Sequence, residues 1–126
     1  MAKQDLMRTY LDLVVAGDLE GATSYYTDDV VLHWAGNGPI SGTYSGKAEY
    51  LAALQKLRSI VDGTSVEEHD LLTSDDHAVV LNRGTYTRGD DSITTNRVVV
   101  YHFSGDKISE VWVVEEDQSA VDAFLS

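Results

Sequence analysis

Histidines are the side chains of this sequence best suited to move a proton near neutral pH, and His33 is the strongest candidate among the four. It lies beside Trp34 in the segment 30–34, which is rich in strand-forming residues. An imidazole there can serve as a general base or as a hydrogen-bonding group for a substrate. Because neighbouring side chains of a strand point to opposite faces, only one of His33 and Trp34 can face an interior. The alternative interpretation of His33 is a half-buried strand residue bonded to the backbone.

Asp117 is the second candidate for acid–base chemistry. It follows Trp112 by five residues. A carboxyl group held beside an indole in a dry interior has a raised pKa that suits proton transfer. The alternative is that Asp117 caps the N-terminus of a short final helix that begins at Gln118. The sequence leaves both interpretations open.

Aromatic residues are numerous enough that several are expected to line one amphipathic pocket. Buried Tyr and Trp side chains usually place their polar ends against a hydrogen-bonding partner, and a core of this size offers few such partners. The aromatic residues concerned are Tyr10, Tyr25, Tyr26, Trp34, Tyr44, Tyr50 and Trp112.

No cofactor and no metal site is expected. The sequence has no cysteine, which removes thiolate nucleophiles and cysteine-ligated metals, and it has no HExxH or comparable ligand spacing. The acidic doublets at 28–29, 75–76 and 90–91 are typical of turns. The segment 42–46 is close to a hydrolase nucleophile elbow, but its serine is one position late and the nearby glycines lack dinucleotide-binding spacing.

Length and charge limit the class of protein. The chain has 126 residues, which favours one domain over 1–126, and 9 basic against 21 acidic residues give a net charge of −12. Such an acidic chain repels phosphate backbones, so no nucleic-acid partner is expected. The longest apolar runs are too short to span a bilayer, and the first residues lack the apolar core of a signal peptide. A cytoplasmic protein without a membrane partner is therefore expected.

Hydrophobic periodicity predicts helices and strands that are segregated along the chain. Helices are predicted over 3–16, 19–26, 45–61 and 118–125. Strands are predicted over 30–34, 66–73, 77–87, 92–103 and 107–115, and hairpin-length turns join the last four. This order indicates an α+β fold in which helices pack on one face of an antiparallel sheet. Long bent strands closing over helices would leave a cone-shaped interior, where ligand pockets are common.

The other face of that sheet is expected to be apolar as well. Val99, Tyr101, Val111 and Val113 are interpreted as outward-facing strand residues. A sheet that is apolar on both faces, with helices on only one, needs a second covering layer. The simplest such layer is a second copy of the chain, so a homodimer through the sheet face is predicted.

Residues spread along the chain carry a resemblance to a known family. They are Tyr10 and the segments 16–21, 26–32, 38–47 and 107–112. Together they resemble the SnoaL-like group of the nuclear transport factor 2-like superfamily, whose members include ketosteroid isomerase, scytalone dehydratase, limonene epoxide hydrolase and small polyketide cyclases. The resemblance covers nearly the whole chain. It implies a strongly curved antiparallel or mixed sheet wrapped around N-terminal helices in a cone, the cystatin-like α+β barrel.

The resemblance to ketosteroid isomerases implies a role for one residue of this chain. Two other functional residues of those enzymes have no counterpart here. Tyr10 stands seven residues before Gly17, the spacing of the tyrosine that those enzymes use as an oxyanion donor. Their strand-one aspartate, the general base, falls on His33 or Trp34 according to the register chosen. Their second donor, a protonated aspartate, falls near Val98. The steroid isomerase set is therefore not reproduced.

The resemblance to epoxide hydrolases and cyclases concerns the last strand. Those relatives place an acidic residue shortly after a late-strand tryptophan. Asp117 is the better match and Glu115 is the alternative. The arginine-with-aspartate pairing of the epoxide hydrolases is not evident, although Arg83 and Arg97 lie on predicted strands.

Three functions from different classes follow. The first is acid–base catalysis, of isomerase, cyclase or hydrolase type, on an apolar oxygenated substrate such as a polyketide, terpenoid or steroid-like ring, with His33 or Asp117 as the base and Tyr10 as the oxyanion donor. The second is a ligand-binding module without chemistry, and the third is a dimeric interaction scaffold. The residues expected to line the pocket are Trp34, Tyr26, Tyr44, Leu54, Val98 and Trp112.

Overall fold

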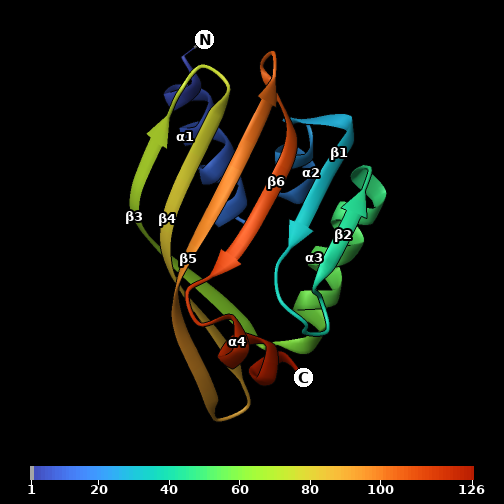
Figure 1. Cartoon of the computed structure of the whole chain (residues 1–126), viewed down its shortest axis with the longest axis vertical. Helices are drawn as coiled ribbons and strands as arrows, with labels where there is room; N and C mark the ends of the chain where they lie inside the picture. Colours follow the sequence, from blue (N-terminus) through green and yellow to red (C-terminus); the bar gives the residue numbers. More distant parts are fainter. Residues whose placement is uncertain (1) are drawn as a thin grey trace.

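The computed structural model describes residues 2–126 (Figure 1). Its helices are α1 (Lys3–Val15), α2 (Leu19–Thr23), α3 (Lys47–Ile60) and α4 (Gln118–Leu125). Its strands are β1 (Tyr26–Trp34), β2 (Gly42–Ser45), β3 (Gly63–Thr73), β4 (His77–Arg88), β5 (Asp91–Ser104) and β6 (Lys107–Glu115). The predicted α+β class is confirmed. Across the described residues, no helix is long and apolar enough to cross a membrane.

The six strands form one mixed sheet in the order β2-β1-β6-β5-β4-β3. The predicted meander of four late strands is present, because β3 to β6 pair in sequence and antiparallel. β1 joins this meander by running parallel to β6, and β2 pairs antiparallel with β1 at the edge. In Figure 1, α1, α2 and α3 lie on one side of the sheet, and α4 lies at the lower end, beyond the end of β6.

α2 is capped by Asp18 and is shorter than the helix predicted over 19–26. The Asp18 carboxylate accepts a hydrogen bond from the Gly21 backbone N–H at 2.9 Å, which satisfies a free donor at the start of the helix. The helix ends at Thr23. It cannot continue further because Tyr26 already pairs with Ile108 of β6.

Two strand features differ from the prediction. β1 begins four residues earlier than predicted, because its first residue joins β6. The four-residue β2 was not predicted at all. It lies at the sheet edge and is mostly exposed, so it carries no alternating apolar pattern.

Strand alternation places the core on the face that the helices cover. Val99 and Tyr101 of β5 are buried there and lie opposite Val113 and Val111 of β6, respectively. The prediction that these four residues face outward is wrong, because the register puts both pairs on the inner face. The predicted homodimer must therefore rest on the residues that do face outward, which are Val98, Val100, Trp112 and Val114.

Hydrogen bonds hold α4 against the loop between β1 and β2. The Asp122 carboxylate accepts hydrogen bonds from the Asn37 backbone N–H at 2.7 Å and from Gln118 Nε2 at 3.0 Å. Gly36 has a φ of +94°, and a Cβ at this position would lie 2.5 Å from the Asp122 carboxylate. The loop approaches the helix this closely because residue 36 has no side chain.

We predict that Gly36→Ala lowers the free energy of unfolding by about 2–4 kcal/mol, because it combines a left-handed backbone with a clash against Asp122. Gly89→Ala is the matched control. Gly89 also has a positive φ, of +61°, but among residues 2–126 no atom beyond its two chain neighbours lies within 4 Å of its Cβ position. Gly89→Ala should therefore cost only about 1–2 kcal/mol. Urea unfolding of both variants measures the difference, and equal losses would contradict the contact between the loop and α4.

Candidate functional site

A cavity of about 130 Å³ lies between the helices and the inner face of the sheet. Its sheet side is formed by apolar residues of β1, β5 and β6, among them Leu32, Trp34, Val99, Val111 and Val113. Its helix side is formed by residues of α1, α2 and α3, among them Val14, Leu19, Leu51 and Leu54. An apolar cavity of about 150 Å³ holds a benzene-sized molecule, so this cavity suits a single six-membered ring.

Four tyrosines from four elements converge on the cavity and form what we call the tyrosine cluster. They are Tyr10 of α1, Tyr26 of β1, Tyr50 of α3 and Tyr101 of β5. The hydroxyl oxygens of Tyr10 and Tyr26 are hydrogen-bonded at 2.6 Å. The ring centroids of Tyr10 and Tyr101 lie 5.6 Å apart, and those of Tyr26 and Tyr50 lie 4.5 Å apart. Because one hydroxyl of the bonded pair donates to the other, the second proton can be donated to a further oxygen.

Burial keeps the tyrosine cluster neutral. It raises the pKa of Tyr26 to about 12 and raises the pKa values of Tyr10 and Tyr50 well above 10. Burial, reinforced by the neighbouring Tyr50, also raises the pKa of Tyr101. A neutral phenol donates a hydrogen bond, so the cluster offers donors to a molecule in the cavity and places no negative charge there.

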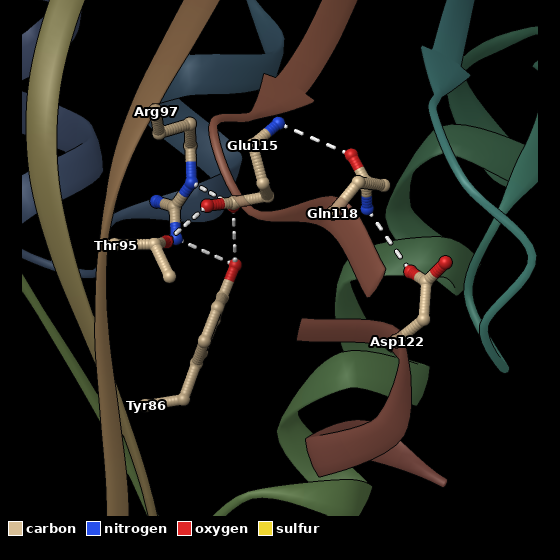
Figure 2. A network of polar contacts seen from close by, with 6 residues as sticks. All are labelled: Tyr86, Thr95, Arg97, Glu115, Gln118 and Asp122. Atoms are coloured by element: carbon tan, nitrogen blue, oxygen red, sulfur yellow. Dashed lines mark hydrogen bonds and ion pairs between the residues drawn. The ribbon is translucent and has the colours of Figure 1, made fainter. Parts of the chain in front are cut away.

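Arg97 lines the same cavity and pairs with the buried Glu115 (Figure 2). Arg97 Nε donates to Glu115 Oε1 at 2.5 Å, and its Nη2 donates to the Tyr86 hydroxyl oxygen at 2.6 Å. The Thr95 hydroxyl donates to Glu115 Oε2 at 2.5 Å. The Glu115 side chain is 0% exposed and that of Arg97 is 11% exposed. A charge this deeply buried requires a charged partner and further hydrogen bonds, and both are present.

β4 provides the space in which the Arg97 guanidinium lies. A Cβ at Gly84 would be 2.6 Å from Arg97 Nη2, so a larger residue would displace the guanidinium. The guanidinium carbon lies 5.0 Å from the centroid of the Tyr86 ring, a cation–π distance. Within residues 2–126, the hydrogen bonds of Arg97 use Nε and Nη2, and none of them uses Nη1.

A chain of polar contacts connects this ion pair to α4 and to the loop before β2. The Glu115 backbone N–H donates to Gln118 Oε1 at 3.1 Å, and Gln118 Nε2 donates to Asp122 (Figure 2). Asp122 in turn accepts from the backbone of Asn37. The end of β6 is thereby held against the end of β1, next to the cavity wall.

Four residues predicted for the pocket or for catalysis line the cavity. They are Tyr10, Tyr26, Trp34 and Leu54. Since Trp34 faces inward, His33 at the preceding position faces outward, which settles the choice that strand alternation left open.

His33 and Trp112 lie on the outer face of the sheet, which corrects the expectation that they line the pocket. The register places His33 beside Trp112, and their rings stack with centroids 5.4 Å apart. His33 Nε2 lies 2.5 Å from Glu110 Oε2, in a pair whose side chains are 32% and 36% exposed. The imidazole is therefore separated from the cavity by the sheet itself.

Tyr44, Val98 and Asp117 also lie away from the cavity. Tyr44 is on the edge strand β2, and its hydroxyl donates to the Ile40 carbonyl oxygen at 2.6 Å. Val98 is exposed on the outer face. Asp117 accepts a hydrogen bond from the Ala120 backbone N–H at 3.2 Å, so it acts as the cap of α4. The expectation that Val98 lines the pocket is wrong for the same reason as for His33 and Trp112. Tyr44 lies opposite the inward-facing Leu32, but β2 is the edge strand and Tyr44 is not part of the cavity lining.

Sequence reasoning did not select Arg97 and Tyr101 as site residues. It named Tyr50 only among the aromatic residues of which several were expected in the pocket, and Glu115 only as an alternative to Asp117. For Arg97 and Tyr101, the sequence contained a pattern that could have identified them. Arg97 and Tyr101 are four residues apart on one strand and so share a face. Their common face was assigned to the outside, which removed both from the candidates.

No three or more His, Asp or Glu side chains of the described chain are grouped as a metal ion would require. The groups that line the cavity are apolar side chains, phenols, one threonine and one guanidinium. Their chemistry suits an organic molecule with a hydrogen-bond acceptor.

Comparisons with known proteins agree with this architecture. A family model described as SnoaL-like domain matches residues 7–111. No curated protein matches the sequence. Among solved structures, a Xanthomonas campestris protein with a cystatin-like fold is 26% identical, with a TM-score of 0.91 over 100% of this chain and 99% of that one.

Two further structures show the same fold at lower identity. An NTF2-like protein from Burkholderia pseudomallei is 18% identical, with a TM-score of 0.90 over 100% of this chain and 99% of that one. TerC, co-crystallized with polyporic acid, is 17% identical, with a TM-score of 0.84 over 97% of both chains. The predicted cystatin-like, nuclear transport factor 2-like fold is therefore confirmed.

We predict that Arg97→Met lowers the free energy of unfolding by about 3–5 kcal/mol, because it leaves the buried Glu115 carboxylate without its charged partner. The double variant Arg97→Met/Glu115→Gln should recover most of this loss, since neither side chain then carries a charge. Chemical denaturation of wild type, Arg97→Met, Glu115→Gln and the double variant gives the four free energies of unfolding of a double-mutant cycle. Additive losses would show that the two side chains do not interact as the structure describes.

Stability should fall as pH rises above 10. Unfolded tyrosine ionises near pH 10, whereas Tyr26 in the folded protein ionises only near pH 12. The neutral phenol of Tyr26 therefore makes its full contribution to the free energy of unfolding below pH 10. This contribution is lost progressively toward pH 12, where the free energy of unfolding falls by about 1.4 kcal/mol per pH unit for this residue. Urea unfolding across this range should show a shallower slope for Tyr26→Phe than for wild type. Identical slopes would contradict the burial of the Tyr26 hydroxyl.

Proposed function

We propose that this chain, which belongs to the SnoaL-like domain family, binds a small, apolar, oxygen-bearing molecule in the cavity beneath its helices. The observation that carries the proposal is the tyrosine cluster, which places neutral hydrogen-bond donors in a cavity whose other lining residues are mostly apolar. Small-molecule sites commonly combine apolar walls with a few placed polar groups. The relative TerC was co-crystallized with polyporic acid, which supports a small-molecule ligand here as well.

The ligand oxygen would accept a hydrogen bond from the Tyr10–Tyr26 pair. These two hydroxyls are bonded to each other, and the proton that this bond does not use can be donated to a ligand oxygen or to a neighbouring phenol of the cluster. A carbonyl oxygen suits this arrangement, because it accepts without having to donate. The same donor would stabilise negative charge that develops on that oxygen, which is the role that the family resemblance implies for Tyr10.

Acid–base catalysis in the same cavity is the second candidate function, and the observation that favours it is the position of Tyr10 in the lining. A reaction also needs a base within hydrogen-bond reach of the ligand. No Asp, Glu or His of residues 2–126 lines the cavity, and His33 and Asp117 lie outside it. The geometry therefore supports binding better than catalysis. Recovery of a bound molecule unaltered after prolonged incubation distinguishes the two.

We predict that cyclohexanone, a ring that matches the cavity in size, binds the wild-type protein. The double variant Tyr10→Phe/Tyr26→Phe should weaken its affinity about fivefold, because it removes both hydroxyls that could donate to the ligand and therefore one hydrogen bond of about 1 kcal/mol. Tyr44→Phe is the matched control, since its hydroxyl bonds to the Ile40 carbonyl oxygen away from the cavity. Titration followed by NMR measures all three affinities. Equal affinities for the two variants, or no binding to wild type, would contradict the assignment of the tyrosine cluster.

A further inference from the structure

The cavity beneath the helices has a buried end and an accessible end. The tyrosine cluster and the apolar sheet residues that line it are all buried, and none of them is more than 8% exposed. Apart from Arg97, whose side chain is 11% exposed, the accessible lining residues belong to the helices. They are the exposed Val14 in the last turn of α1 and the half-buried Leu19, Thr23, Leu51 and Leu54 of α2 and α3. The cavity therefore reaches the surface on its helix side.

A surface groove of about 430 Å³ adjoins this accessible end. Three residues line both the cavity and the groove, namely Leu19 and Thr23 of α2 and Leu51 of α3. Beyond them, the groove is lined by Glu20, Ser24, Lys47 and Gln55. Because the same three side chains border both spaces, we place the mouth of the cavity at these residues.

Helix packing does not close this mouth. α2 packs on α1, and α3 packs on β1 and β2, so neither of these contacts fills the space between α2 and α3. The side chains at the mouth are half-buried and can change rotamer. A substituent that leaves the cavity here therefore has to displace side chains and not a packed pair of helices.

The polar groups of the groove are largely engaged with the protein itself. The Thr23 hydroxyl donates to the Leu19 carbonyl oxygen at 2.5 Å, and the Ser24 hydroxyl donates to the Gly21 carbonyl oxygen at 2.6 Å. Lys47 Nζ lies 3.5 Å from a carboxylate oxygen of Asp28. Next to these groups, the groove presents the apolar side chains of two leucines at the mouth. Its chemistry suits an aliphatic chain, which needs no hydrogen-bond partner.

We propose that the ligand is a cyclic ketone with an unbranched aliphatic chain, whose ring lies in the cavity and whose chain lies in the groove between α2 and α3. This inference rests on the proposed binding function and names its ligand class. A cavity of about 130 Å³ holds one six-membered ring, so a longer molecule has to extend out of it. With its carbonyl oxygen on the buried tyrosine cluster, the ring directs a substituent at the opposite carbon away from the buried hydroxyls.

Three ketones test the proposal in NMR titrations of the full chain. They are cyclohexanone, 4-butylcyclohexanone with an unbranched chain, and 4-tert-butylcyclohexanone with the same number of carbons in a compact group. Complete burial of one methylene strengthens binding about fourfold, and a groove open to water on one side should give about half of that. We therefore expect the butyl ketone to bind about tenfold more tightly than cyclohexanone. The tert-butyl ketone should gain little, because its branched group has to fit beside the ring.

Two outcomes of these titrations would overturn the proposal while leaving the binding function intact. One is a butyl ketone that binds no more tightly than cyclohexanone. The other is a tert-butyl ketone that binds as tightly as the butyl ketone, since the gain would then follow from apolar area and not from the groove. Failure of all three ketones to bind wild type would overturn the binding function as well.

Two variants of α3 show whether the chain lies in the groove. Gln55→Trp fills the groove at a residue that does not line the cavity, so it should bind cyclohexanone as wild type does and lose the preference for the butyl ketone. Ala52→Trp is the matched control, because Ala52 is exposed and lines neither space. It should keep the wild-type preference. A preference that survives in Gln55→Trp, or that is lost equally in Ala52→Trp, would overturn the assignment of the chain to the groove.

Discussion

The structure depends on satisfying one buried carboxylate, that of Glu115. It is the only buried acidic residue among residues 2–126, and a charge in that position is tolerated because Arg97 and two hydroxyls meet it. Those partners come from β4 and β5, and the backbone of Glu115 reaches α4 through Gln118. The ion pair therefore fixes how the last strand, the last helix and the middle of the sheet meet. It also fixes a guanidinium in the cavity wall, so the contact that stabilises the fold also shapes the site.

Most of the fold could be predicted from the sequence because helix and strand periodicities are local properties. The amphipathic spacing of α1 and α3 and the turns of the late meander marked those elements to within a few residues. β2 could not be found, because a short exposed edge strand has no apolar pattern. The end of α2 was missed because Tyr26 is taken into the sheet by pairing with Ile108, a contact between residues far apart in sequence.

The site was predictable only in part, because its composition depends on which face of each strand turns inward. Tyr10 and Trp34 were identified, but the choice between His33 and Trp34 required the register of β1 against β6. The inward face of β5 was assigned to the outside, so Tyr101 was taken for a surface residue. The choice between a cavity role and a capping role for Asp117 required the position of α4, which is held by the contact of Asp122 with the Asn37 backbone.

A crystal structure of the protein grown with cyclohexanone tests the central claim most directly. The account predicts the ring inside the cavity between Trp34 and Val99, with its oxygen about 2.7–3.0 Å from the hydroxyl oxygen of Tyr10 or Tyr26. A ring bound instead on the outer face beside Trp112, or a cavity closed by its own side chains with no ring in it, would contradict the account.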